Sequence, residues 1–282
     1  MRDIASEMEE EELELKDRVI GLSMGYGSLV VTTALQCCIY ALANLNTPHI
    51  FDLKDTVNFI QLGEKYILMV DNKDMHVYSY DGRPVCQPKF QGMRPEAFNA
   101  QTVSMSTESI AVIDHSDAKL VRVFDTATGK EQGKPIQHVL DVTSVAMNRW
   151  GSAAHRKCVL LDRNRDLYVV SVGAAASGGR EATPYKLGTM CDSAMWNSET
   201  DMLVAMMVRS LLSPRAPLPT PFSRREASGR VLTRAPPPFQ DAKQVVWYYP
   251  NVVFVDRDLT VQTKVARERP PPPPKRSNRR TT

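Results

Sequence analysis

The sequence has few of the features on which secreted and membrane proteins depend. Its five cysteines are an odd number, and none belongs to a Cys-x-x-Cys pair, so neither a disulfide scaffold nor a zinc ribbon is indicated. There is no Asn-x-Ser/Thr glycosylation site. No apolar run approaches the roughly 18 residues of a membrane helix, and Met1–Glu14 is acidic without a signal-peptide core. We therefore expect a soluble protein of a reducing intracellular compartment.

Aromatic residues are also scarce, at 7%, but hydrophobic residues together make up 43% of the 282 positions. This content is sufficient to bury the core of one large domain or two small ones. It excludes a wholly disordered chain, a collagen and a disulfide miniprotein.

Charge and proline are distributed unevenly along the chain. The formal net charge is +3, yet Arg209–Phe239 carries about +5 and Lys264–Thr282 about +6, which leaves about −8 for the remainder. The same two segments contain 12 of the 19 prolines. An acidic, proline-poor body therefore carries two basic, proline-rich segments, and the average charge does not indicate a partner.

From Arg18 onward, short apolar strands alternate with polar turns. Each unit contains an apolar strand that often ends in Asp, a tight turn and a strand of alternating polarity. Five equivalent apolar positions are spaced by about 38, 43, 49 and 44 residues, a period typical of WD40-type propeller blades with four strands each. These positions are Leu29, Ile67, Ile110, Val159 and Leu203.

We therefore predict an all-β fold, a WD40-like β-propeller that is incomplete, with about five four-stranded blades. An ordinary β-sandwich with uneven hairpins is the alternative. The central strand pairs expected in the first four blades are Leu29–Thr33 with Cys37–Tyr40, Tyr66–Asp71 with Met75–Tyr80, Ser109–Asp114 with Lys119–Asp125, and Lys157–Asp162 with Asp166–Ser171.

The fifth pair is expected between Met202–Met206 and Gln244–Tyr248, with one basic segment inserted between its strands. That segment has neither strand alternation nor a helical period. The predicted organisation is an acidic lead-in over residues 1–16, propeller blades over 17–206, a disordered Pro/Arg-rich insertion over 207–239, the end of the last blade over 240–260, and a disordered Pro/Arg-rich tail over 261–282.

The sequence predicts no catalytic, cofactor-binding or metal-binding residue. Asp114-His115-Ser116 contains the residue types of a catalytic triad, but sequence neighbours cannot converge as nucleophile, base and orienting group, so a polar turn is expected. The glycines of Gly25-Tyr26-Gly27 precede no helix that could bind a phosphate, which favours a hairpin turn. The histidines are scattered without the spacing of a metal site.

The basic tail has one weak interaction motif. Pro270, Pro273 and Lys275 have the spacing of a polyproline segment that SH3 domains bind. Nucleic-acid binding is not indicated, because no aromatic residues accompany these basic residues and the body of the chain is acidic.

Several sequence blocks, in a consistent order from Asp17 to Leu259, resemble the 80-kilodalton WD-repeat subunits of intraflagellar transport complex B. The most specific blocks lie in the last repeat. They are Leu187-Gly-Thr-Met190, Trp196-Asn197, Val246-Trp-Tyr-Tyr-Pro-Asn251 and Val255-Asp-Arg-Asp258, and earlier blocks include Val77-Tyr-Ser-Tyr80, Asn99-Ala-Gln-Thr-Val-Ser104 and Asp162-Arg-Asn-Arg-Asp-Leu-Tyr168.

The resemblance implies that the chain is a fragment, part of the second propeller of a longer protein. It implies a non-enzymatic scaffold that supports cilium assembly by binding other complex B subunits, located in the cilium, the ciliary basal body and the cytoplasm, with no nucleic acid and no membrane insertion. Two other interpretations stay open: a vesicle-coat or other intracellular WD40 scaffold, and a propeller enzyme. Oligomeric state is not predicted.

Overall fold

The computed structural model describes residues 13, 15–172, 183–197, 202–207, 230–231, 244–248, 251–255 and 261–265. In these residues the chain is almost entirely β-structure. Two short 3₁₀ turns, Pro95–Ala97 and Ala153–His155, are the helical segments of the described part. The strands form four four-stranded and two three-stranded sheets.

The four four-stranded sheets are antiparallel meanders, here called blades 1 to 4. Blade 1 consists of β1 (Gly21–Gly25), β2 (Ser28–Thr32), β3 (Gln36–Ala41) and β4 (Asn44–Asp52), and blade 2 of β5 (Val57–Leu62), β6 (Tyr66–Asp71), β7 (Met75–Ser79) and β8 (Pro84–Cys86). Blade 3 consists of β9 (Val103–Met105), β10 (Ser109–Ile113), β11 (Leu120–Asp125) and β12 (Ile136–Gln137), and blade 4 of β13 (Val142–Met147), β14 (Lys157–Asp162), β15 (Leu167–Ser171) and β16 (Tyr185–Gly188).

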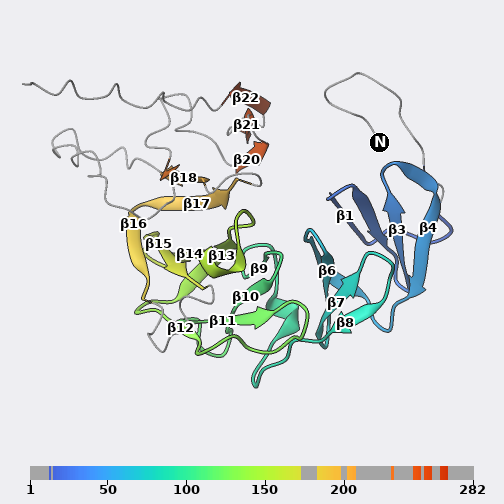
Figure 1. Ribbon diagram of the computed structural model, residues 1–282, viewed down its shortest axis with the longest axis horizontal. Coiled ribbons are helices and arrows are strands. Elements are labelled where there is room, and N and C mark those ends of the chain that lie inside the picture. Colours follow the sequence, from blue (N-terminus) through green and yellow to red (C-terminus); the bar gives the residue numbers. More distant parts are fainter. Residues whose placement is uncertain are drawn as a thin grey trace, which may run out of the picture.

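The two three-stranded sheets follow in the chain. Blade 5 consists of β17 (Cys191–Trp196), β18 (Met202–Met207) and β19 (Arg230–Val231), and blade 6 of β20 (Gln244–Tyr248), β21 (Asn251–Val255) and β22 (Val261–Val265). The blades are arranged one after another in an arc (Figure 1). Consecutive blades contact one another through their first strands, so β1, β5, β9, β13, β17 and β20 lie on the inner side of the arc.

Apolar clusters between neighbouring blades hold the arc together. The second strand of each blade is central and buried on both faces, which explains its continuous apolar sequence. In blade 2, for example, Ile67 and Met69 face blade 1, whereas Leu68 and Val70 face blade 3. At about 25 cal/mol per Å² of buried apolar surface, these clusters are the main stabilising term of the fold.

All four predicted central strand pairs are confirmed, as β2–β3, β6–β7, β10–β11 and β14–β15. The predicted hairpin at Gly25–Gly27 is also present, because Gly25 pairs with Ser28 across a two-residue turn. Tyr26 and Gly27 both have positive φ, 51° and 70°, as a primed hairpin turn requires.

The last predicted pair is wrong. Gln244–Tyr248 does not pair with β18; it pairs with β21 and begins blade 6, while β18 pairs in parallel with Arg230–Val231 inside the expected insertion. Only two residues separate β20 from β21, so closing that hairpin costs much less chain entropy than pairing across the insertion. A further strand, β22, lies within the segment 261–282 that was expected to be a tail.

The expected lead-in also contributes to packing. Leu13 and Leu15 lie against a cluster on the outer face of blade 1. That cluster consists of Leu29, Val31, Cys38 and Tyr40. The apolar residues of this acidic segment are therefore part of the core.

Candidate functional site

The candidate triad at Asp114-His115-Ser116 is a polar turn, as expected. The Ser116 hydroxyl donates a 2.5 Å hydrogen bond to the Asp114 carboxylate, so serine and carboxylate meet without the histidine between them. The His115 ring lies 5.8 Å from the ring of Phe98. This geometry provides no base for the serine hydroxyl.

A carboxylate at the end of the second strand is repeated in blades 2, 3 and 4. In each case it accepts backbone N–H groups of its own turn and contacts one basic side chain. The pairs are His76 with Asp71 at 3.0 Å, Arg122 with Asp114 at 2.9 Å, and His138 with Asp162 at 3.3 Å. The repetition indicates a structural role, because each carboxylate fixes the turn in its own blade.

The electrostatics of Asp114 agree with that role. Burial by itself raises the pKa of this carboxyl, but the hydrogen bonds from Ser116 and Arg122 outweigh burial and hold the pKa below its ordinary value. Asp114 is therefore a permanently ionised partner of Arg122 near neutral pH, and it is not a general acid.

The cysteines are buried thiols with little nucleophilic character. Burial raises the pKa of Cys37 and of Cys158 to about 12, and that of Cys86 to about 11. Because the thiolate is the reactive form, these groups are inert near neutral pH. Among the described residues, no group of three or more His, Cys, Asp or Glu side chains is arranged to hold a metal ion.

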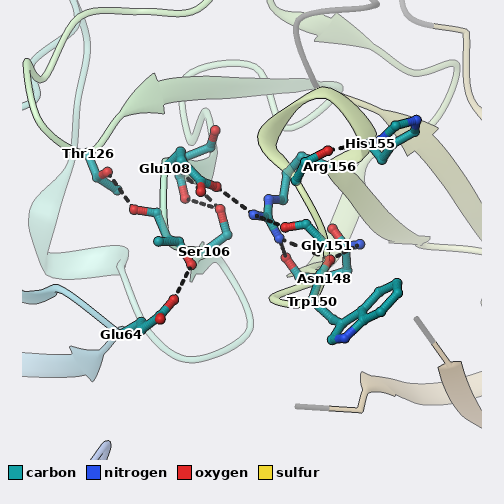
Figure 2. A network of polar contacts seen from close by, with 12 residues as sticks. Glu64, Ser106, Glu108, Thr126, Asn148, Trp150, Gly151, His155 and Arg156 are labelled. Carbon is teal, nitrogen blue, oxygen red and sulfur yellow. Dashed lines mark hydrogen bonds and ion pairs between the residues drawn. The ribbon is translucent and has the colours of Figure 1, made fainter. Parts of the chain in front are cut away.

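The opposite end of the blades, at the turns between first and second strands, contains an extended polar network (Figure 2). Its centre is Arg156, whose side chain is only 1% exposed. The guanidinium donates to the carbonyl oxygens of Asn148, Trp150 and Gly151, at 2.9, 3.4 and 3.2 Å. It also donates to Oε2 of Glu108 at 2.5 Å. One buried guanidinium thus holds a loop of blade 4 and joins it to a turn of blade 3.

The network continues into blade 2. The Thr107 hydroxyl donates to Glu64 Oε2 at 3.1 Å, and the Thr126 hydroxyl donates to the carbonyl of Thr107 at 3.0 Å. Glu64 lies in the turn between β5 and β6, whereas Thr107 and Glu108 lie between β9 and β10. Polar contacts therefore connect three consecutive blades at one end of the arc.

The loop that Arg156 holds presents an exposed tryptophan. Residues 148–156 connect β13 to β14, a longer connection than the two-residue turn of blade 1. The Trp150 side chain is 51% exposed although its carbonyl is fixed from below, and Figure 2 shows its indole on the outer side of the network. A rigid backbone under an exposed aromatic ring is a favourable arrangement for protein binding, because little entropy is lost.

Arg149 extends this surface across the arc to blade 1. Its Nη1 donates to the Tyr26 hydroxyl at 3.1 Å, and its guanidinium lies 5.8 Å from the centre of the Tyr26 ring. We call Tyr26, Arg149 and Trp150 the aromatic–arginine surface. Nearby, the Tyr80 hydroxyl donates to the Gly63 carbonyl at 2.6 Å, and burial, reinforced by Tyr26, raises its pKa to about 12.

Sequence reasoning did not identify this surface. Asn148-Arg149-Trp150-Gly151, with its turn-forming glycine between two strands, marks a loop, but nothing in the pattern indicates its contact with Tyr26. The SH3-type motif at Pro270, Pro273 and Lys275 lies outside the described residues. In the described part of the chain, no helix has the length and apolarity needed to cross a membrane.

Comparison with known proteins gives a consistent result. Residues 1–217 match the family described as IFT80 second beta-propeller. The chain is 37% identical to the intraflagellar transport protein 80 homolog of Rattus norvegicus and 36% identical to that of Mus musculus, over 91% of the chain in both cases. It spans 29% of the length of these relatives.

Two solved structures resemble the fold with TM-scores of 0.50. KlHsv2 with loop 6CD replaced by a Gly-Ser linker is 15% identical, with 72% of this chain and 67% of that chain covered. The WD40 domain of SCAP from fission yeast is 8% identical, with 89% and 52% covered. At these identities the likeness concerns the fold alone, and it confirms the predicted WD40-like propeller.

Proposed function

The chain belongs to the IFT80 second beta-propeller family, and from this membership we propose that it acts as a non-enzymatic scaffold in complex B of the intraflagellar transport particle. The proposal extends to cilium assembly, with the chain located in the cilium, the basal body and the cytoplasm. The observation that carries it is the match over residues 1–217, together with relatives named as intraflagellar transport proteins.

The aromatic–arginine surface is the part of the molecule best suited to bind another complex B subunit. Trp, Tyr and Arg are the residues most often responsible for binding energy at protein interfaces. Tyr26 is 43% and Trp150 is 51% exposed, so both rings offer apolar area to a partner. Arg156 and Glu108 support the loop from below, so the surface does not have to be ordered on binding.

Binding to complex B particles isolated from cilia tests this proposal. The tagged chain is expected to co-sediment with the particles. Trp150→Ala is expected to weaken binding about 30-fold, the effect of a hot-spot residue worth about 2 kcal/mol. Arg149→Glu is expected to weaken it further, because it reverses a charge at the centre of the surface.

Val139→Ala is the matched control. Val139 is 81% exposed and precedes β13, so it lies at the opposite end of that strand from Trp150. This substitution is expected to leave binding unchanged. Absence of wild-type binding would contradict the scaffold proposal, whereas normal binding by Trp150→Ala would show that another surface is used.

A further inference from the structure

The segment before blade 1 repeats the end of blade 1 itself. Leu13-Glu-Leu-Lys-Asp-Arg-Val19 corresponds to Phe51-Asp-Leu-Lys-Asp-Thr-Val57, with apolar residues, acids, lysine and valine at the same places. The two segments are about 38 residues apart, the same separation as that of Leu29 and Ile67 in the blade repeat. By sequence, then, residues 13–19 occupy the position where an outer strand ends and leads into a new blade.

The structure places the two segments equivalently. Phe51 and Leu53 pack on the cluster between blades 1 and 2. Leu13 and Leu15 pack on the corresponding face of blade 1. Leu13 and Leu15 therefore lie where the outer strand of a blade preceding blade 1 would lie.

The inner part of the same face is uncovered. Leu22 and Met24 are 65% and 55% exposed on β1. Leu22 pairs with Val31 and Met24 with Leu29, which makes them equivalent in register to Val103 and Met105 of blade 3. Val103 and Met105 are at most 1% exposed, because blade 2 covers them. Blade 1 thus has an outer strand seated on it, but no inner strands.

Blade 6 has the complementary deficiency. It contains three antiparallel strands in the order β20-β21-β22, and its first strand contacts β17 on the inner side of the arc. The outer edge of β22 has no fourth strand in the described residues, whereas blades 1 to 4 each have one. One chain therefore contains a three-stranded blade and a separate outer-strand segment.

We propose that the N-terminal segment ending at Leu15 adds as the fourth strand to β22, so that blade 6 becomes four-stranded and covers Leu22 and Met24. The arc then closes into a ring of six blades. This inference goes beyond the proposed function and does not rest on it.

The repeat fixes the register of this pairing. The two-residue turn between β20 and β21 aligns Asn251 with Ser28, and the strand pairs then align Val261 with Cys37. Cys37 pairs with Phe51 in blade 1, and Phe51 corresponds to Leu13. We therefore expect Leu13 opposite Val261.

The charges that follow from this register are complementary. Antiparallel pairing with Leu13 opposite Val261 places Glu10 opposite Lys264 and, one turn of the pattern further, Glu7 opposite Arg267. Opposite charges directly across an antiparallel pair stabilise it. At larger scale, the acidic residues 1–16, with a net charge of about −5, would lie beside the basic residues after β22.

Hydrogen exchange of the full chain tests the added strand. Amides of residues 261–265 are expected to be protected, and Leu13→Asp combined with Leu15→Asp is expected to accelerate their exchange at least tenfold. Leu42→Asp is the matched control, because Leu42 is already 37% exposed at the turn after β3. Exchange of 261–265 that is indifferent to residues 13 and 15 would overturn the proposal.

A charge-reversal pair tests the register without altering apolar residues, so it does not depend on the first variant remaining folded. Glu10→Lys and Lys264→Glu are each expected to accelerate exchange of 261–265, and the double variant is expected to restore protection. Failure of the double variant to restore it would overturn the register. Protection that appears only as a dimer forms with rising concentration would overturn closure within one chain and assign the strand to a second copy.

Discussion

Nη1 of Arg149 donates a 3.1 Å hydrogen bond to the hydroxyl of Tyr26, although the two residues are 123 positions apart in the sequence. Tyr26 lies in the β1–β2 turn of blade 1 and Arg149 in the β13–β14 loop of blade 4. The contact therefore joins two blades that are not neighbours in the arc. It can form only if the arc has the curvature that the three intervening interfaces between blades impose.

We expect Tyr26→Phe to destabilise the chain by less than about 1 kcal/mol, because the hydrogen bond is partly exposed to water. Arg149→Ala is expected to cost slightly more, since it also removes the contact with the aromatic ring. Denaturant unfolding of both single variants and the double variant gives the coupling energy. A coupling energy of zero would contradict a direct interaction in solution.

Arg156→Met is expected to destabilise the chain by about 3–5 kcal/mol, the range for breaking a buried ion pair. The substitution keeps most of the volume but leaves Glu108 and three carbonyl groups without their donor. Arg163→Met is the control, because Arg163 is 78% exposed and 3.8 Å from Asp141, and we expect it to cost less than about 0.5 kcal/mol. Equal midpoints of urea unfolding for the two variants would contradict this assignment.

The pairing of Asp114 with Arg122 predicts a loss of stability in acid. The pKa of Asp114 is lower in the folded state than its ordinary value of about 3.9 in an unfolded chain. Its contribution is therefore complete above about pH 4 and is lost as the pH falls through the lower folded value.

Unfolding of wild type and Asp114→Asn at several pH values checks this dependence. The difference in unfolding free energy between the two is expected to be constant from about pH 5 to pH 8 and to shrink below about pH 4. A difference that already disappears above pH 5 would show that the carboxylate is not stabilised by its partners.

Gly82→Ala is expected to be more destabilising than Gly133→Ala. Both glycines have positive φ, 78° and 73°, so an alanine costs about 1–2 kcal/mol of backbone strain at either position. A Cβ on Gly82 would also lie 2.9 Å from Cδ1 of Phe51, whereas a Cβ on Gly133 would have no neighbour within 4 Å. The overlap is expected to add about 1–3 kcal/mol, measurable by thermal unfolding. Equal melting temperatures would contradict the close approach of Gly82 to Phe51.

The cysteines are expected to resist labelling in the native state. Burial raises the pKa of Cys86 and Cys191 to about 11 and that of Cys37 and Cys158 to about 12, so at pH 8 about one thiol in a thousand or fewer is ionised. Absorbance after addition of a disulfide reagent should rise slowly for the native chain and report all five thiols after denaturation. A thiol that reacts rapidly in the native chain would contradict the described packing.

Most of the strand pairing followed from the local pattern. Tyr66–Asp71 and Met75–Ser79 form a hairpin because both strands have the required polarity and a short turn joins them. The prediction failed at Gln244–Tyr248, where two candidate partners competed. Two residues of separation favoured β21, and no periodicity in the strand itself indicated that choice.

The candidate surface was much less predictable. Trp150 is one of three tryptophans, and nothing in its immediate sequence indicates that it is exposed rather than buried. Its exposure depends on Arg156, which holds the carbonyls beneath it and lies beside Glu108, 48 residues earlier in the chain. Contacts of this kind are set by the packing of one blade on the next.

The sequence by itself determined the blades and the face that each side chain occupies, because strand polarity alternates with a period of two and hairpin turns are local. Only the tertiary structure decided what lies opposite what between blades. The contacts of Arg156 with Glu108 and of Arg149 with Tyr26 depend on the curvature of the arc, which is the sum of all the packing between blades. No single segment of the sequence encodes that curvature.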